Sequence, residues 1–289
     1  MKTVRKITAV ICVLLLAGGI FGICVNAENG DVDYTVNNPY ADVNWKTVKQ
    51  FKADLHSHTT ASDGNNTLKE MTEAHYDKGF DIVAVTDHGV TDYGWTKANT
   101  IPAMKVVVVA FKDRPAFIQV LDENGGEAGN GNTYSLVTKN GDDYYYQTDG
   151  EGTQGKYMMR VPYGIENNPS SINNAHVNSW FADYGNGRMG GTSDYVTPIA
   201  GVDRLGGLSV INHPGEYTNA RDEVYTEDAY NEKNISYKYI IQKFAGILMN
   251  YDTCIGIDCN SKGDSRTRFD RKLWDILLQK VVPSGRNVF

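Results

Sequence analysis

The chain has 289 residues, of which 41% are hydrophobic and 22% are charged, and its formal net charge is −7 at pH 7. This length and composition are enough to bury a complete core, and a single barrel-type domain of this size is ordinary. The acidic surface repels the phosphate backbone of nucleic acids, which argues against nonspecific binding to polyanions.

The N-terminal segment 1–27 has the pattern of a secretory signal peptide. Basic residues precede the apolar run 7–25, and residues 25–27 fit the expected cleavage position. Two alternatives stay open. One is an uncleaved membrane anchor, because the run approaches the length that spans a bilayer. The other, a lipoprotein acylated at Cys24, is weaker because Ile23 is a poor residue before a modified cysteine. We expect a secreted or extracytoplasmic protein, bound to the membrane only if the segment stays uncleaved.

Cleavage would change both the charge and the cysteine content of the chain. It removes Lys2, Arg5 and Lys6 and no acidic residue, so the net charge changes from −7 to −10. Two of the four cysteines remain, Cys254 and Cys259. On one predicted strand this spacing points the two thiols to opposite sides, so they cannot pair with each other. We expect two buried thiols and no disulfide framework.

Residues 28–47 are polar and aperiodic, which predicts a linker in front of a domain that spans 48–289. The domain opens with a strand expected at 48–52 that leads into Asp54-Leu55-His56-Ser57-His58. Because residues two apart on a strand face the same side, the two imidazoles should project together. Asp63, in the loop beyond, adds a hard oxygen ligand, so this segment is a candidate site for a divalent metal.

Two histidines spaced in this way also fit a half-buried strand on which the rings are only hydrogen-bonded. The second cluster, Thr86-Asp87-His88, favours the metal site. Between the clusters, Thr67-Leu68-Lys69-Glu70 has the form of a capping box, and Gly79 ends the expected helix. His75, inside this helix, is expected to pack rather than to bind metal. The run 80–86 is then a buried strand that completes a βαβ unit.

Residues 97–160 interrupt this pattern and predict a β-rich insertion. Within it, Asn140-Gly141 separates the strand-like runs 134–138 and 143–148, which is a strong signal for a hairpin. Further strands are expected at 158–162, 176–180, 208–212 and 254–259, and helices at 236–248 and 270–281. Residues 287–289 would begin another strand.

Five of the six histidines, together with Asp63 and Glu166, fall at the ends of predicted strands. In a barrel of βα units the carboxyl ends of the strands converge on one face, where active sites are built. These side chains, far apart in the sequence, are therefore expected to meet at one barrel mouth.

Several blocks resemble the PHP (polymerase and histidinol phosphatase) family: 54–64, 79–89, Gly164-Ile165-Glu166, His176-Val177-Asn178 and Ile211-Asn212-His213-Pro214. The resemblance covers most of the chain beyond residue 50 and implies an α/β fold, a distorted (β/α)7-type barrel, here with the β-rich insertion. The family has a final block with an aspartate and a histidine ligand, and this sequence has no such pair. We therefore expect an incomplete C-terminal part. Either the sequence is a fragment, which its end inside an apolar run favours, or part of the site has been lost.

The resemblance also implies the metal ligands: His56 and His58 for a first ion, Glu166 bridging the first and second, His176 and His213 completing the second, and Asp63 and His88 for a third. The missing pair would have served the first and third ions, whereas the second keeps its full set. Imidazole with carboxylate suits zinc, manganese or iron, so two or three divalent ions are expected without a choice among these metals. Asp54 and Asp87 should lie behind the ligands and orient histidines through ring N–H bonds.

The activity that the resemblance implies is hydrolysis of a small phosphomonoester, such as a nucleotide or sugar phosphate, by a metal-activated hydroxide. The catalytic set would be His56, His58, Glu166 and His213, with Arg188 and Arg221 as candidate clamps for the substrate phosphate. A phosphodiesterase or exonuclease is the alternative, but it would need a basic groove, and the charge argues against stable nucleic-acid binding. A non-catalytic secreted binding module with a degenerate metal site is the third reading.

Overall fold

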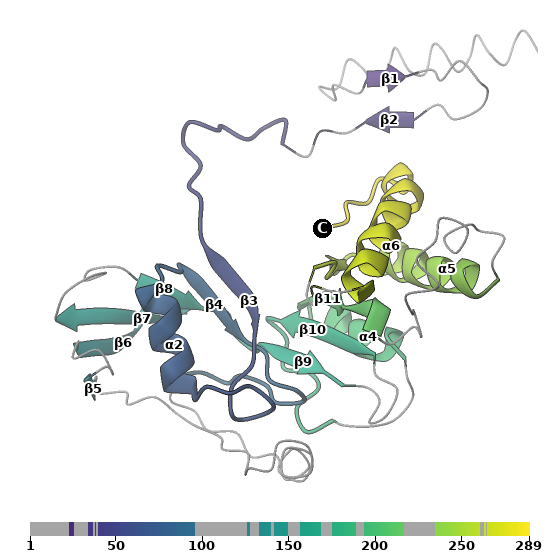
Figure 1. Cartoon of the computed structure of the whole chain (residues 1–289). Helices are drawn as coiled ribbons and strands as arrows, with labels where there is room; N and C mark the ends of the chain where they lie inside the picture. The colour runs from purple at the N-terminus through teal and green to yellow at the C-terminus, as the bar shows by residue number, and fades with distance from the viewer. Residues whose placement is uncertain are drawn as a thin grey trace, which may run out of the picture.

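Figure 1 shows the structure of the chain, a computed structural model. It describes residues 38, 40–95, 157–168, 175–188, 194–216, 235–260, 263 and 265–289, together with strands at 23–25, 34–36, 126–127, 133–139 and 142–149. Most of the expected signal peptide lies outside the described residues. Its last part, Ile23–Val25, is strand β1, which pairs antiparallel with β2, Tyr34–Val36. No helix among the described residues is both long enough and apolar enough to cross a membrane.

A six-stranded sheet holds the first half of the domain, in the order β3-β4-β8-β7-β6-β5. Its parallel part consists of β3 (Ala53–Ser57), β4 (Ile82–Val85) and β8 (Tyr157–Arg160). Its antiparallel part consists of β7 (Asp142–Asp149), β6 (Thr133–Lys139) and β5 (Gly126–Glu127). The predicted hairpin is confirmed, because Lys139 pairs with Asp142 across Asn140-Gly141.

Helix α2, Leu68–Asp77, connects β3 to the parallel strand β4, so the predicted βαβ unit is confirmed. Thr67 and Glu70 form the predicted capping box, and Gly79 follows the helix with a positive φ of 78°. The apolar face of α2 packs on β4 and β8 through Met71, Tyr76, Val83 and Met158. The prediction that the first strand begins at residue 48 is wrong, because residues 48–52 are exposed coil and β3 contains His56 itself.

A four-stranded sheet holds the second half, in the order β12-β11-β10-β9. Its strands are β9 (Ile165–Asn167), β10 (His176–Trp180), β11 (Leu208–Asn212) and β12 (Cys254–Ile257). Strands β11 and β12 are parallel, whereas β10 runs antiparallel to both of its neighbours.

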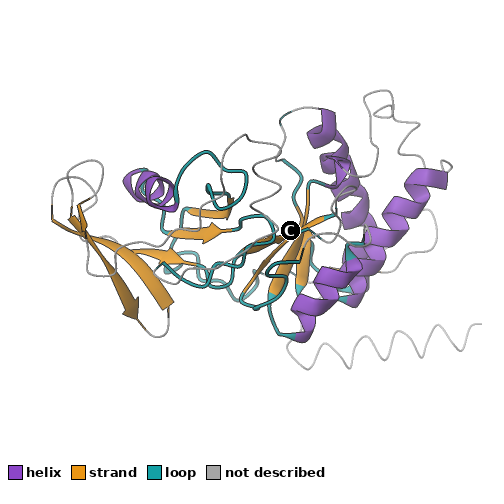
Figure 2. Cartoon of the chain, turned by 90° about the horizontal axis from the view of Figure 1, so that it is seen from below, coloured by secondary structure: helices purple, strands orange, loops and turns teal. Residues whose placement is uncertain are grey.

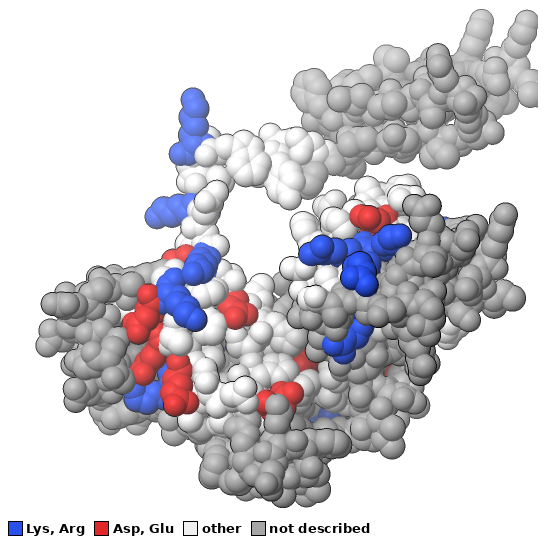
Figure 3. Space-filling model, in the orientation of Figure 1, with Lys and Arg blue, Asp and Glu red and all other residues white. Residues whose placement is uncertain are grey.

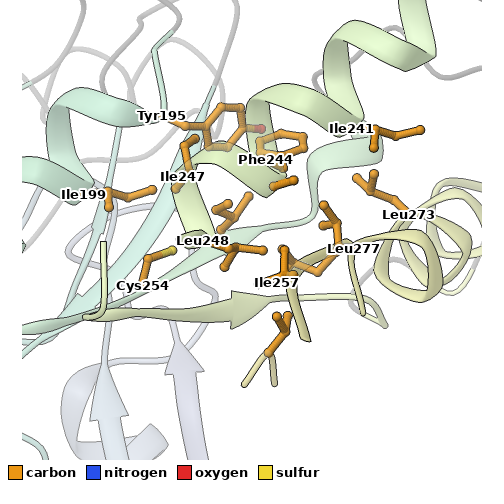
Figure 4. Close-up of a cluster of buried hydrophobic side chains, with 14 of the residues drawn as sticks. Tyr195, Ile199, Ile241, Phe244, Ile247, Leu248, Cys254, Ile257, Leu273 and Leu277 are labelled. Atoms are coloured by element: carbon orange, nitrogen blue, oxygen red, sulfur yellow. The ribbon is translucent and has the colours of Figure 1, made fainter. Parts of the chain in front are cut away.

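Helices α4 (Val196–Arg204), α5 (Ile235–Asn250) and α6 (Ser265–Val281) gather beside the four-stranded sheet, whereas the insertion strands extend at the opposite end (Figures 1 and 2). Helix α6 begins at Ser265 rather than at the predicted residue 270. The 3₁₀ turns η2 (Pro214–Glu216) and η5 (Val282–Ser284) follow β11 and α6. Phe244, Leu248 and Leu277 belong to the largest buried cluster of this half, together with Ile257 of β12 (Figure 4).

Two contacts join the two sheets. His88 forms an isolated parallel bridge with Glu166, and the indole Nε1–H of Trp180 donates to the carbonyl of Leu55 at 3.2 Å. Within the described residues, strand pairing does not close the sheets into one barrel. The mixed α/β class is confirmed, and the (β/α)7-type barrel stays a prediction.

The last residues and the cysteines lie near β12. Phe289 exchanges backbone hydrogen bonds with Ile255 and Ile257, so it lies beside β12, although residues 287–289 are not a regular strand. Cys254 is buried and Cys259 is partly buried, and both are free thiols, as predicted except for the partial exposure of Cys259.

Candidate metal centre

Glu166, on the short strand β9, lies at the centre of the candidate site, and its side chain has no exposure to solvent. Gly164, two residues earlier, packs so closely on β4 that a Cβ there would lie 2.3 Å from the carbonyl oxygen of Val85. The backbone N–H of Gly89 donates to the carbonyl of Glu166 at 2.9 Å. These contacts hold Glu166 beside the loop that follows β4.

The five histidines predicted as ligands all approach this carboxylate. Three ring nitrogens surround Oε2: His58 Nε2 at 2.9 Å, His88 Nδ1 at 3.1 Å and His56 Nε2 at 3.4 Å. Two more face Oε1: His176 Nδ1 at 3.0 Å and His213 Nε2 at 3.2 Å. The fold therefore brings together side chains from both sheets.

Asp63 completes the predicted set of seven. Its Oδ1 lies 2.6 Å from His58 Nδ1 and 3.6 Å from His88 Nε2. The loop that carries it closes tightly, because a Cβ on Gly64 would lie 2.3 Å from the carbonyl oxygen of His58. Only glycine allows this approach, which holds Asp63 beside the two imidazoles.

Asp87 organises the same loop. Its carboxylate accepts hydrogen bonds from the Thr59 backbone N–H and hydroxyl, each at 2.7 Å, and from the Ser62 hydroxyl at 2.5 Å. The sequence predicted that Asp87 would orient a histidine ring. Instead, it positions the backbone and hydroxyl groups of the loop between His58 and Asp63.

His176 reaches the site in a way that the sequence did not predict. The site residues were expected to converge at carboxyl ends of strands, but His176 is the first residue of β10, as in the strand predicted at 176–180. Because β10 is antiparallel to β11, His176 pairs with Asn212, the last residue of β11. The amino end of β10 therefore lies at the same edge as the carboxyl end of β11, where His213 follows.

Two asparagines that the sequence analysis did not single out contact the site. The amide of Asn168 lies between two rings, with Oδ1 3.0 Å from His88 Nδ1 and Nδ2 2.8 Å from His176 Nε2. Asn212 Nδ2 donates to Glu166 Oε1 at 2.8 Å. Asn212 could have been found from the sequence, because it lies next to His213. Asn168 has a weaker signal, because it lies two residues after Glu166, directly beyond the end of β9.

These residues fit a divalent metal. Three groups have ligand atoms that all lie within 4.8 Å of one another: His56, His58 and Glu166; His58, Asp63 and His88; and His88, Glu166 and His176. Glu166 Oε2 is buried without a hydrogen bond although three imidazole nitrogens are close to it. A cation bound between the carboxylate and the rings would satisfy this oxygen, and such a donor set suits transition metals.

A family model described as PHP domain matches residues 54–248. The chain belongs to the PHP domain family. The resemblance of the sequence blocks is thereby confirmed, and membership indicates a metal-dependent phosphoesterase in general terms.

The chain is also similar to the DNA polymerase/3'-5' exonuclease PolX of Bacillus subtilis, strain 168, with 51% identity over 39 residues. The matched stretch is 14% of this chain and only 7% of PolX. The chain therefore spans a small part of that relative.

The histidines and carboxylates of the candidate metal centre, called the PHP site below, shift one another's pKa values. Burial opposes ionisation of Glu166, but the electrostatic effect of His88 and His176 outweighs it and holds the pKa of the carboxyl well below its usual range. Burial likewise opposes protonation of His58, but the neighbouring carboxylates of Asp63 and Glu166 outweigh it and raise its pKa to about 10. Burial lowers the pKa of His176 to about 4. Ionised carboxylates and a neutral His176 are the forms that bind metals.

Asp54 and His75 form a separate pair behind the PHP site. Asp54 Oδ2 lies 2.9 Å from His75 Nε2, and Oδ1 accepts a hydrogen bond from the backbone N–H of His56 at 3.0 Å. Asp54 was predicted to orient a ligand ring. Its ring contact is instead with His75 of α2, the histidine predicted to pack.

The candidate phosphate clamps remain predictions. Arg188 is exposed, and its guanidinium lies 4.7 Å from the centre of the Tyr184 ring and donates to the Tyr184 hydroxyl at 3.3 Å. The backbone N–H of the neighbouring Gly187 donates to the carbonyl of Gly89, so the loop borders the residue after His88. Arg221 lies outside the described residues.

Proposed function

We propose that the chain is a metal-dependent phosphoesterase that hydrolyses a small phosphomonoester, such as a nucleotide or a sugar phosphate. The observation that carries this proposal is the fully buried Glu166 carboxylate, with five imidazole nitrogens within 3.4 Å of its two oxygens. A buried carboxylate and several imidazoles form a strong site for divalent transition metals.

The proposed site holds two or three divalent ions of zinc, manganese or iron. Their ligands are the seven residues predicted from the sequence. The ligands are His56, His58, Asp63, His88, Glu166, His176 and His213. When bound, such ions supply neutralisation of phosphoryl oxygens and a water that ionises near neutral pH. A distorted (β/α)7-type barrel is part of the same proposal.

The residues around Glu166 divide by exposure, which suggests where substrate enters. The side chains of His176 and His213 are 8% and 4% exposed, whereas those of His56 and Asp63 are 27% and 46% exposed. In this proposal Glu166 and the two buried histidines anchor the metals. His56 and Asp63 then face the entering phosphate, and Asp63 keeps His58 oriented through Nδ1.

Exonuclease activity is the second candidate, because the short match to PolX favours a phosphodiester substrate. The net charge of −7 opposes a nucleic-acid substrate. Basic side chains nevertheless gather over α6, whereas acidic and basic side chains both lie over α2 (Figure 3). Because the net charge opposes a nucleic-acid substrate, the small phosphomonoester remains the first proposal. Because basic side chains gather over α6, the substrate test includes single-stranded DNA.

We also propose that the protein is exported, because segment 1–27 has the composition of a signal peptide. Expression with the segment intact, followed by N-terminal sequencing of the mature protein, tests this. Cleavage near residue 27 supports export, whereas an intact N-terminus in the membrane fraction supports an anchor.

The main experiment combines metal analysis with substrate hydrolysis. The purified chain should contain two or three equivalents of transition metal and hydrolyse p-nitrophenyl phosphate faster than bis-p-nitrophenyl phosphate or single-stranded DNA. The double variant His56→Ala, His58→Ala should lose both metal and turnover while keeping its circular dichroism spectrum. Full turnover in this variant would refute the assignment, and metal binding without turnover on any phosphoester would support a binding module instead.

A further inference from the structure

We propose that Asp270 of α6 is a positioning residue for His213, an inference that rests on the proposed function because it treats His213 as a metal ligand. Asp270 is completely buried. Its Oδ1 accepts a hydrogen bond of 2.6 Å from the backbone N–H of Gly215. Gly215 lies two residues after His213, in the turn η2, so the bond joins a helix to the segment that carries the ligand.

The backbone at His213 needs such support. Its φ is +24°, a region that residues with a side chain rarely adopt. Pro214 follows directly and fixes its own φ. A strained residue persists only where its surroundings hold it. The Asp270–Gly215 hydrogen bond acts at the first backbone N–H after this strained position, because Pro214 has none.

The packing between the turn and α6 leaves no room for a side chain on Gly215. A Cβ at this position would lie 2.8 Å from Asp270 Oδ1 and 2.9 Å from the carbonyl oxygen of Arg266. Glycine therefore allows the helix to approach the turn at its backbone. A short hydrogen bond from a buried N–H to a carboxyl oxygen is a strong constraint on this geometry.

The hydrogen bond from Gly215 to Asp270 affects Glu166 through the side chain of His213. His213 Nε2 lies 3.2 Å from Glu166 Oε1, so a shift of the turn would move the imidazole away from the carboxylate. Helix α6 begins at Ser265, beyond the segment 54–248 that matches the PHP domain. The support for this ligand thus comes from a helix outside the matched segment.

Cobalt titration of the metal-free chain, followed by visible absorption, tests the role of Asp270. Asp270→Leu keeps the branched shape and the number of side-chain heavy atoms but removes the acceptor, and Asp270→Asn keeps an acceptor oxygen. Asp275→Leu on the same helix, at an exposed position, is the matched control. We expect Asp270→Leu to weaken Co²⁺ binding at least about tenfold and to change the cobalt spectrum, as for other groups that orient ligands. Asp270→Asn and Asp275→Leu should match the wild type.

A folded Asp270→Leu variant with wild-type affinity and spectrum would overturn the inference while leaving the proposed function intact. Absence of Co²⁺ binding by the wild type would overturn both. If Asp270→Leu does not fold, hydrogen exchange of the Gly215 amide in the wild type decides the question. Slower exchange after saturation with Zn²⁺ supports the coupling of this amide to the site, and unchanged exchange refutes it.

Discussion

The two sheets contribute unlike halves to the site. The six-stranded sheet supplies His56, His58, Asp63 and His88, whose side chains are between 15% and 46% exposed. The four-stranded sheet supplies Glu166, His176 and His213, whose side chains are at most 8% exposed. One half is a buried anchor and the other is open to solvent, so metal retention should depend most on the first and substrate access on the second.

The difference follows from how the strands run. His56 lies near the end of β3, and the loops after β3 and β4 carry His58, Asp63 and His88; loops lie at the surface. Glu166 and His176 are instead within paired strands, and α4, α5 and α6 cover that sheet (Figure 1). Side chains inside a covered sheet lose their contact with water, which strengthens their mutual electrostatic interactions.

The largest expected effect is loss of the charge at the buried centre. Glu166→Gln keeps the shape of the side chain but removes the only carboxylate that the five imidazoles share among the described residues. We expect metal affinity and turnover to fall by more than about 100-fold, beyond the range typical of groups that only orient ligands. Inductively coupled plasma mass spectrometry and phosphatase kinetics measure both.

Asp63→Asn is the matched variant in the open half, and it should retain more metal than Glu166→Gln. A greater loss of metal in Asp63→Asn would show that the division into a buried anchor and an open half is wrong.

The next effect concerns the residue that joins the two halves. Asn168 contacts His88 from one sheet and His176 from the other. Asn168→Ala should lower metal affinity about 10- to 100-fold, because both rings lose the group that fixes their orientation. The neighbour Asn167 donates to Ser179 Oγ at 2.9 Å, away from the histidines. Asn167→Ala should therefore reduce stability but not metal affinity, and equal affinity loss in both variants would refute this role.

A smaller effect is the dependence of metal binding on pH. In the metal-free protein Asp63 and Glu166 outweigh burial and raise the pKa of His58 to about 10, so a proton occupies this imidazole at neutral pH. A metal must displace that proton, so apparent affinity should rise about tenfold per pH unit for one displaced proton. Titrations with Zn²⁺ between about pH 6 and about pH 8 measure the slope. Asp63→Asn should flatten it, whereas an unchanged slope would contradict this cause.

The smallest effect belongs to the histidine outside the site. The Nδ1 of His75 lies 2.7 Å from the carbonyl of Met71 and its Nε2 lies 2.9 Å from Asp54, so both ring nitrogens face acceptors. The hydrogen bond to Asp54 raises the pKa of His75. Burial opposes ionisation of Asp54, but the hydrogen bonds from His75 and from the backbone N–H of His56 together help to outweigh it and lower the pKa of Asp54. His75→Ala should cost about 0.2–1 kcal/mol of unfolding free energy and leave metal content unchanged.

The sign of the pH dependence follows from the two shifts. The contribution of His75 is fully present below its ordinary pKa of 6.5 and is lost as the pH rises through the higher folded value. The contribution of Asp54 is present above its ordinary pKa of 3.8 and is lost as the pH falls through the lower folded value. Urea unfolding should therefore show the largest difference between wild type and His75→Ala at mildly acidic pH. A difference that grows above neutral pH would contradict the charged pair.

Local patterns in the sequence predicted the elements that depend on near neighbours. The capping box at Thr67 and the Asn140-Gly141 hairpin are local hydrogen-bond patterns, and both are confirmed. The start of β3 was placed too early, because the apolar residues before it are exposed rather than paired. The identity of the seven candidate ligands came from the resemblance of the sequence blocks to the PHP family, and these blocks do not specify the direction of each strand.

By itself, the sequence determined which side chains are candidates for the chemistry, because its blocks resemble those of the PHP family. Only the tertiary structure decided how they meet. The antiparallel direction of β10 places His176 at its amino end, and Asn168 and Asp270 reach the site from residues with no motif of their own. Contacts between residues far apart in the chain depend on how sheets and helices pack, and no local pattern specifies that packing.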